Sequence, residues 1–345
     1  MTIGMIGSGS WATALVKILT DAGHPVHWCV RTEKMVKHIR DRGHNPNYLS
    51  SVHFNRDLLR LTDQPARILE ACDAVILAVP SAYLQQQLDP IPAGAFTGKR
   101  VVSAVKGILP EKNILLNDYL EREKSVPLQR YFTIMGPCHA EEVAAEKLSY
   151  LTFSGVDEGE TETLASMFRT PYLNTVVNAD VYGVQFAAIL KNIYALGAGI
   201  AHGLEYGDNF LSVFIANAAD EMAGFLRKVG IRNIEVGVHA PAGDAHARKS
   251  PNYAASVYLG DLLVTCYSLF SRNRTFGNMI GKGYSVKSAQ LEMNMVAEGY
   301  NASRSIFHIN RDIGAEMPIA ETVYRILWEG LPAGQGFNGI ESGLI

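Results

Sequence analysis

The sequence predicts an α/β protein in which a doubly wound parallel sheet is followed by an all-helical domain. Three observations predict this fold class. A glycine-rich turn separates the first apolar run from the first helical segment, strand-like apolar runs then alternate with helical segments, and long helical patterns replace that alternation near residue 178. We therefore expect a Rossmann-like domain over residues 1–178 and a helical domain over residues 179–345.

The first stretch, TIGMIGSGSWATAL at residues 2–15, has the pattern of a strand, a tight turn and a helix start. Gly7 allows the turn, Gly9 lets a pyrophosphate approach the backbone, and Ala12 lets the helix pack closely on the strand. The free N–H groups of the new helix then face the phosphates. A turn of this kind also occurs without a ligand, but its place at the first strand of an alternating pattern favours a dinucleotide site.

The remaining elements of the first domain follow from apolar runs, since a continuous run such as AVILAV at residues 74–79 is typical of a buried parallel strand. Strands are expected at 25–30, 74–79, 100–105, 131–135, 150–154 and 173–177. Helices are expected at 32–41, 65–71, 81–88, 111–121 and 158–168, with a turn-rich loop at 43–57.

The second domain shows apolar residues at helical spacing. Helices are expected at 181–203, 208–229, 258–271, 286–313 and 318–329. The glycine-rich tail from residue 332 is expected to be frayed.

Composition limits the classes of function. The chain has 345 residues, a net charge of −3 and a pI near 6.4, so nothing predicts binding to nucleic acid or to an anionic membrane. The four cysteines form no C-x-x-C pair and fit buried thiols in a reducing compartment. No basic leader precedes the first strand, and no long uncharged apolar run is present. We expect a cytoplasmic protein without membrane insertion.

Lys191 lies in the segment QFAAILKNIYALGAGIAHG, which is apolar on both sides of the expected helix. A lysine there is costly unless it is paired or functional. Burial also lowers the pKa of a lysine, which suits it to acid/base chemistry near neutral pH. The alternative is a lysine whose stem packs while its amine reaches water.

Several polar or small residues directly follow expected strands, where ligands of doubly wound sheets bind. Lys106 follows one strand, and Gly136, Cys138 and Ala140 follow the next. The alternative for Lys106 is a solvated loop lysine.

A basic patch lies further along the chain. Asp261, Thr265 and Arg272 fall near one face of a helix, and Ser271, Arg272 and Asn273 offer donors that match phosphate oxygens. The alternative is a basic helix C-terminus that interacts with its own dipole.

The histidines show no spacing typical of metal ligands, and His239 and His246 flank a proline- and glycine-rich loop. We therefore expect no metal.

These pieces, in this order, resemble the NAD(P)-dependent glycerol-3-phosphate dehydrogenases, especially the bacterial biosynthetic type. The combination of LKN, GDL-x-x-T and SRNR-x-FG is specific to that family. The similar stretches are IGSGSWATAL, AVKGI, GPCHAEE, LKNIYALGAGI, GDLLVTC, SRNRTFG and VAEGY.

The resemblance implies a two-domain enzyme that reduces dihydroxyacetone phosphate to sn-glycerol 3-phosphate for phospholipid synthesis. It implies that Lys191 is the acid/base on the C2 oxygen and that Asp261 and Thr265 hold it in place. The substrate residues that it implies are Lys106, Gly136, Cys138, Asn192, Asp261, Thr265, Ser271, Arg272 and Asn273. The cofactor residues are Gly7, Gly9, Ser10, Trp11, Ala12, Arg31, Lys106, Ala140, Arg272, Val296 and Glu298.

Three features depart from the family pattern. Cys138 stands where Ser or Thr is usual, and a thiol is a weaker donor. His139 replaces an aromatic residue, and the segment 236–259 is longer than expected.

The end of the second expected strand bears on the choice of cofactor. An acid there would bind the ribose 2′-hydroxyl of NAD, whereas an arginine accommodates the 2′-phosphate of NADP. Arg31 stands at that end, with Glu33 two places on. We expect NADP(H), with NAD(H) as the alternative.

Two other functions stay open at this point. A β-hydroxyacid dehydrogenase shares the layout of a nucleotide domain, a helical domain and a helix lysine, but it recognises a carboxylate. A non-catalytic NADP sensor would keep the pocket without needing Lys191. A homodimer is the default expectation for an enzyme of this kind.

Overall fold

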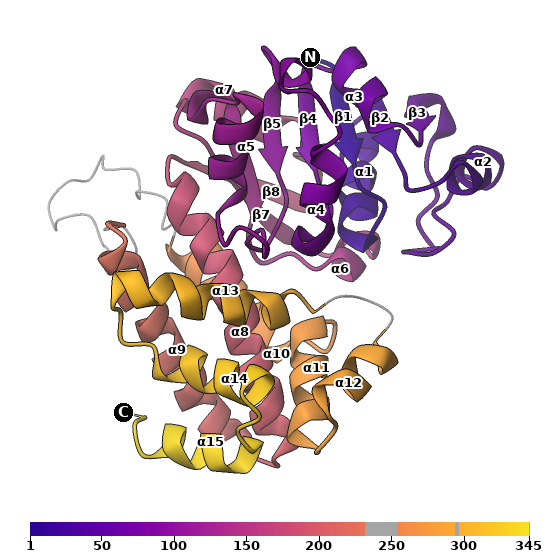
Figure 1. Cartoon of the computed structure of the whole chain (residues 1–345). Coiled ribbons are helices and arrows are strands. Elements are labelled where there is room, and N and C mark those ends of the chain that lie inside the picture. Colours follow the sequence, from indigo (N-terminus) through magenta and orange to yellow (C-terminus); the bar gives the residue numbers. More distant parts are fainter. Residues whose placement is uncertain (232–253, 294–296, 345) are drawn as a thin grey trace, which may run out of the picture. The chain divides into compact units, whose positions relative to one another are not determined.

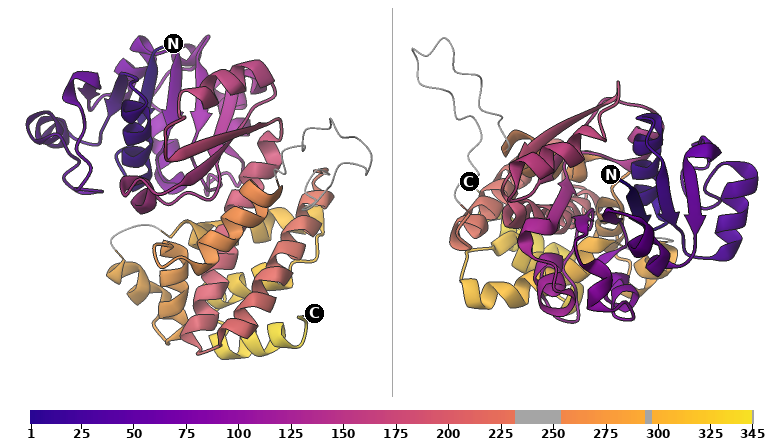
Figure 2. Two further views of the ribbon diagram at one scale, coloured as in Figure 1. Left: turned by 180° about the vertical axis from the view of Figure 1, so that it is seen from behind. Right: turned by 90° about the horizontal axis from the view of Figure 1, so that it is seen from above.

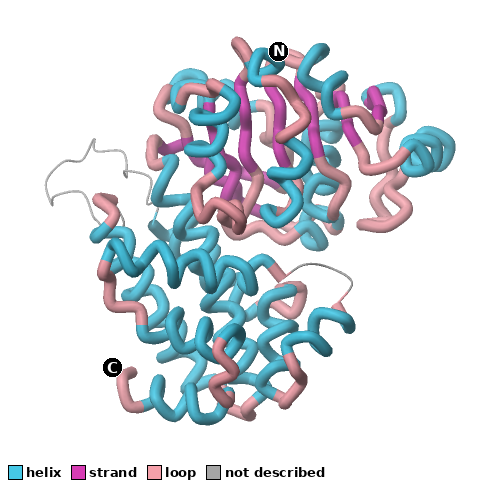
Figure 3. Tube along the Cα trace, in the orientation of Figure 1, coloured by secondary structure: helices cyan, strands magenta, loops and turns pink. Residues whose placement is uncertain are grey.

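The computed structural model describes residues 1–231, 254–293 and 297–344. The chain divides into two compact units. One comprises Met1–Val105 with Ile114–Val181, and the other comprises Lys106–Asn113 with Tyr182–Ile345. In the described part of the chain every strand belongs to the first unit, whereas the second is helical (Figure 3). Residues 106–113 fall within the domain predicted at 1–178, but they belong to the helical unit.

The first unit is built on one eight-stranded sheet in the order β3-β2-β1-β4-β5-β6-β7-β8. Neighbouring strands are parallel except β6 and β7, which are antiparallel. The strands are β1 (Ile3–Ile6), β2 (Val26–Cys29), β3 (Leu59–Thr62), β4 (Ala74–Leu77), β5 (Arg100–Ser103), β6 (Tyr131–Met135), β7 (Ser149–Ser154) and β8 (Leu173–Asn178). The order reverses direction beside β1, as in doubly wound nucleotide-binding sheets, so the predicted fold class is confirmed.

Helices cover both faces of this sheet, with α1 on one face and α3, α4 and α5 on the other (Figures 1 and 2). The helices are α1 (Ser10–Asp21), α2 (Glu33–Arg42), α3 (Pro65–Ala71), α4 (Ser81–Leu88), α5 (Leu116–Lys124), α6 (Ala140–Ala144) and α7 (Glu158–Ser166). The strands β1, β4 and β6 are buried along their whole length, as their continuous apolar runs predict.

Two elements of the first unit differ from the sequence prediction. The strand β3 is not among the predicted strands, because it lies at the sheet edge and only Leu59 of its four residues is buried. The helix expected at 111–121 begins only at Leu116, because the preceding residues 106–113 pack with the other unit.

The second unit is organised around α8 (Val181–Gly203), whose residues from Ala187 to Ala201 are all buried. Among the described residues, α8 is the one helix long and apolar enough to cross a membrane, but 94% of its apolar window is buried inside the protein. That burial is the environment of a core helix. The other helices are α9 (Asp208–Lys228), α10 (Asp261–Tyr267), α11 (Arg272–Gly281), α12 (Val286–Glu292), α13 (Glu298–Ile313), α14 (Pro318–Trp328) and α15 (Ala333–Glu341).

Three expectations for this unit are wrong. The segment predicted as one helix at 258–271 is a π-helical turn, Ala254–Gly260, followed by α10. The segment 286–313 forms two helices, α12 and α13. The tail is not frayed, because it forms α15 and buries Phe337.

Glycines let α11 lie directly against the core helix α8. A Cβ at Gly277 would stand 2.0 Å from the carbonyl oxygen of Leu196, and a Cβ at Gly199 would stand 2.1 Å from that of Arg274. Only glycine permits such an approach of two backbones. The contact fixes the start of α11 beside the middle of α8, where the candidate site residues lie.

Candidate active site

Lys191 lies in the buried middle of α8 and is 3% exposed. Its Nζ donates a hydrogen bond to Oδ1 of Asp261, the first residue of α10, which is 1% exposed. Burial lowers the pKa of Lys191 to about 8; the nearby positive charge of Lys106 acts in the same direction, and Asp261 opposes both. An ammonium group that loses its proton near this pH is suited to act as an acid or a base.

A chain of side-chain amides connects the segments around this lysine. Asn192 donates to the carbonyl oxygen of Lys106 at 3.0 Å, and Asn273 donates to Oδ1 of Asn192 at 2.9 Å. The backbone N–H of Gly299 in turn donates to Oδ1 of Asn273 at 2.9 Å. The segment with Lys106, the core helix α8 and the first turns of α11 and α13 are therefore held together by three hydrogen bonds.

The basic patch lies at the start of a helix, and the alternative of a basic helix C-terminus is wrong. Ser271 is the N-cap of α11, and its hydroxyl accepts a hydrogen bond from the backbone N–H of Arg274 at 3.3 Å. Arg272 and Asn273 are the first two residues of the helix. The N-terminal N–H groups and the helix dipole add to the guanidinium charge, so this end of α11 favours an anion such as a phosphate.

The other candidates of the helical unit are placed as follows. The Thr265 hydroxyl donates to the backbone oxygen of Asp261 at 2.5 Å and so supports the turn that carries the partner of Lys191. Glu298 is the first residue of α13 and is half-buried. Val296 lies outside the described residues, as do residues 232–253 with His239 and His246.

In the first unit, the glycine turn is tightly packed at Gly7 and open at Gly9. Gly7 has φ +140°, and a Cβ there would stand 2.3 Å from the oxygen of Ala78. Gly9 is the N-cap of α1, and a Cβ at Gly9 would have no heavy atom within 4 Å. The backbone at Gly9 is therefore open, directly before Ser10, Trp11 and the fully buried Ala12 at the start of α1.

Arg31 stands at the same edge of the sheet as this turn. The backbone N–H of Gly7 donates to the oxygen of Cys29 at the end of β2, and Arg31 follows two residues later and is exposed. Thr32 caps α2 by accepting a hydrogen bond from the N–H of Met35 at 3.3 Å. Arg31 is thus an exposed arginine that follows the strand bonded to the glycine turn.

The loop after β6 carries the remaining candidates of this unit. Gly136 has φ +124° and packs close to the backbone of β7. Cys138 is 6% exposed, and Ala140 begins α6 with His139 as its N-cap. All four cysteines of the chain are buried free thiols.

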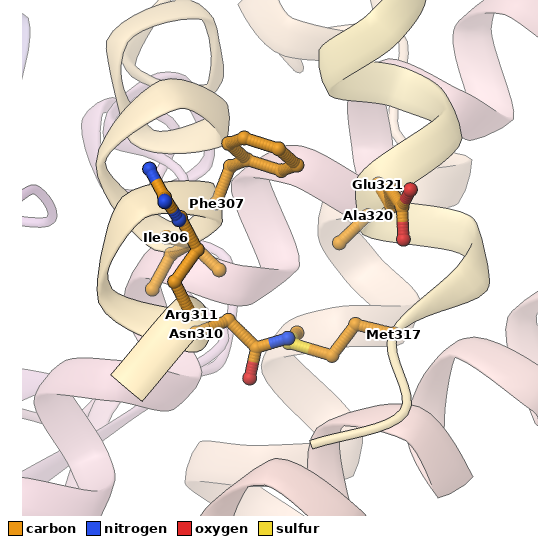
Figure 4. Close-up of a pocket in the computed structure, with 7 residues that line it drawn as sticks. All are labelled: Ile306, Phe307, Asn310, Arg311, Met317, Ala320 and Glu321. Atoms are coloured by element: carbon orange, nitrogen blue, oxygen red, sulfur yellow. The ribbon is translucent and has the colours of Figure 1, made fainter. Parts of the chain in front are cut away.

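A cavity of about 160 Å³ opens between α13 and α14 (Figure 4). Phe307 and Arg311 reach it from α13, and Glu321 from α14. None of the candidate residues lines it. It is smaller than the sites that usually hold cofactors or substrates, so it is not assigned to this site.

Comparison with known proteins decides the family. The profile described as the N-terminus of NAD-dependent glycerol-3-phosphate dehydrogenase matches residues 2–160, and the profile of its C-terminus matches residues 180–338. The chain belongs to this family. The resemblance inferred from its motifs is confirmed.

Relatives in the family cover nearly the whole chain. A glycerol-3-phosphate dehydrogenase [NAD(P)+] from Salinibacter ruber is 34% identical over 95% of this chain and 91% of its own length. One from Chlorobium chlorochromatii is 31% identical over 97% and 96%. The crystal structure of the glycerol-3-phosphate dehydrogenase from Coxiella burnetii has a TM-score of 0.85 at 25% identity and covers 98% of both chains.

More distant structures share the architecture alone. A D-mandelate dehydrogenase has a TM-score of 0.59 at 14% identity, and a ketopantoate reductase from Ralstonia eutropha has 0.56 at 15%. These proteins have the two-part layout that made a hydroxyacid dehydrogenase an alternative. The family match removes the need for that alternative.

Proposed function

We propose that this protein is an NAD(P)-dependent sn-glycerol-3-phosphate dehydrogenase that reduces dihydroxyacetone phosphate for glycerophospholipid synthesis. The observation that carries the proposal is the buried Lys191–Asp261 pair, joined by the amide chain to the N-terminus of α11. A ketone that carries a phosphate group would use both features: the buried ammonium of Lys191 can give a proton to the carbonyl oxygen, and the N-terminus of α11 can bind the phosphate. The experiment that tests it is NADPH oxidation by the purified protein with dihydroxyacetone phosphate, against a 2-oxo acid as the substrate of the alternative enzyme class.

The chemistry assigns a role to each group of side chains. A bound dihydronicotinamide supplies the hydride that reduces the C2 carbonyl carbon. Lys191 stabilises the negative charge that grows on the C2 oxygen and then gives its proton to it, while Asp261 keeps the ammonium in place. Ser271, Arg272 and Asn273 bind the phosphate, and Lys106 and Asn192 orient the substrate. Gly136, Cys138 and Thr265 complete the substrate site.

The pH profile of the reaction follows from the lowered pKa of Lys191. Reduction requires the protonated amine, so kcat/KM for dihydroxyacetone phosphate should fall as the pH rises through about 8. Oxidation of glycerol 3-phosphate requires the neutral amine, so its kcat/KM should rise over the same range. Steady-state rates from pH 6 to 10 in both directions measure this, and two profiles with the same sign of slope would contradict the assignment.

Arg31→Ala should weaken the binding of NADPH far more than the binding of NADH. NADPH carries a 2′-phosphate with which the guanidinium can form charged hydrogen bonds, whereas NADH has a hydroxyl at that position. Hydrogen bonds of this kind contribute about 1.5–3 kcal/mol, or about tenfold or more in affinity. The measurement is KM for each cofactor. Arg67→Ala, at an exposed arginine of α3, is the matched control. Equal weakening of both cofactors by Arg31→Ala would sink the preference for NADP(H).

Further aspects belong to the same proposal. We assign cofactor binding mainly to domain 1–178, including Ala140. We assign catalysis and most of the substrate residues to domain 179–345, with Val296 and Glu298 lining the cofactor. The four buried free thiols support a reducing, cytoplasmic location. A homodimer is the simplest assembly for this enzyme class.

A further inference from the structure

Three successive carbonyl groups of the glycine turn each accept a hydrogen bond from a side chain. Trp28 Nε1 donates to the oxygen of Gly7 at 2.7 Å, and Thr13 Oγ1 donates to the oxygen of Gly9 at 2.8 Å. Between them, Asn45 Nδ2 donates to the oxygen of Ser8 at 3.1 Å. The donors come from β2, from α1 and from the loop after α2, so three separate parts of the unit hold one turn.

Asn45 connects this arrangement. It is fully buried, and its Nδ2 donates a second hydrogen bond to Thr13 Oγ1 at 2.8 Å, while its Oδ1 accepts from the backbone N–H of Asn47 at 3.0 Å. A rotated amide would bring its oxygen against the oxygen of Ser8. The network therefore permits one orientation, with the NH₂ group toward the turn.

The arrangement has a consequence for the opposite side of the turn. In a trans peptide the N–H and C=O groups point in opposite directions. Holding the carbonyls of Gly7, Ser8 and Gly9 toward their donors turns the N–H groups of residues 8–10 the other way. A Cβ added at Gly9 would meet nothing within 4 Å apart from its chain neighbours, so there is room there for an anion.

We propose that Asn45 is a positioning residue for the pyrophosphate of the dinucleotide, acting together with Thr13 through the carbonyls of the turn. Asn45 keeps the turn in its binding conformation before the ligand arrives, which removes an ordering cost from binding. This inference rests on the proposed cofactor site. It concerns the pyrophosphate, which NADP and NAD share, and is thus separate from the role of Arg31 at the 2′-phosphate.

The test measures binding of NADPH, NADH, ADP-ribose and 2′-AMP to the full chain by fluorescence or calorimetry. Asn45→Ala should weaken the binding of NADPH, NADH and ADP-ribose by about tenfold or more, because each of them contains a pyrophosphate. The factor should be similar for all three. It should leave 2′-AMP, which has none, within about twofold. At saturating NADPH, kcat should stay within about twofold of wild type while KM for NADPH rises. Asn47→Ala, an exposed neighbour in the same loop, is the control.

Folding is checked by circular dichroism and by the thermal midpoint without cofactor. A folded Asn45→Ala protein that binds ADP-ribose as tightly as wild type would overturn the inference, as would equal weakening of 2′-AMP. If Asn45→Ala does not fold, Thr13→Val carries the test, because it removes the hydroxyl at nearly constant volume; unchanged ADP-ribose binding would overturn the inference. Wild-type protein that binds no dinucleotide contradicts the proposed function itself, whereas binding without turnover leaves this test intact.

Discussion

Replacing Lys191 by methionine is expected to lower kcat for dihydroxyacetone phosphate reduction by about 10³-fold or more. Methionine keeps the length and volume of the side chain but removes both the charge that stabilises the forming alkoxide and the proton that completes the reaction. Binding of NADPH should change little, since Lys191 has no role in the nucleotide turn. Single-turnover absorbance and NADPH titration measure the two quantities.

The substitution also leaves Asp261 buried without its cationic partner, which is destabilising. The double variant Lys191→Met with Asp261→Asn should therefore regain part of the lost thermal midpoint without regaining turnover. Lys228→Met, at the exposed end of α9, is the control for loss of a lysine. Turnover within tenfold of wild type in a folded Lys191→Met protein would exclude Lys191 as the acid.

Arg272→Ala is expected to lower kcat/KM for dihydroxyacetone phosphate by about 10²-fold, which corresponds to about 3 kcal/mol for the loss of one partner of a charged contact. Unphosphorylated dihydroxyacetone should react slowly with wild type and variant alike. The ratio of kcat/KM for the two substrates is the measured quantity, because it separates recognition of the phosphate from any effect on the reacting carbonyl.

The control for this prediction is Arg227→Ala, at an exposed arginine near the end of α9. NADPH affinity is measured in parallel, because Arg272 is also assigned to the cofactor. If Arg272→Ala slows both substrates by the same factor, the arginine does not recognise the phosphate.

The sequence predicts the central strands of the first unit well, because β1, β4 and β6 are fully buried and so leave continuous apolar runs. The edge strand β3 escapes prediction since Leu59 alone of its residues is buried. In the second unit, α11 contains Gly277 and Gly281, which lower helix propensity but allow the contact with α8. The value of these glycines is visible only once the partner helix is known.

The candidate site also contains residues that the sequence predicts and residues that it does not. Lys191 stands out in the sequence because it interrupts an apolar helix. Its neighbours are joined by contacts between residues far apart in the chain, such as Asn192 and Asn273, which are separated by 81 positions. Asn45 belongs to a turn-rich loop without any periodic pattern, so nothing in the sequence links it to Ser8. The buried Glu221 was missed as well, although it accepts hydrogen bonds from the N–H groups of Ile319 and Ala320 at the start of α14.

The most direct test of the proposed function is oxidation of NADPH and NADH, followed by absorbance, with dihydroxyacetone phosphate and with unphosphorylated dihydroxyacetone. We predict rapid oxidation only with the phosphate ester, a lower KM for NADPH than for NADH, and formation of sn-glycerol 3-phosphate in equal amount to the oxidised cofactor. No oxidation with either substrate, by protein shown to bind NADPH, would contradict the proposed activity and favour a role in sensing the cofactor.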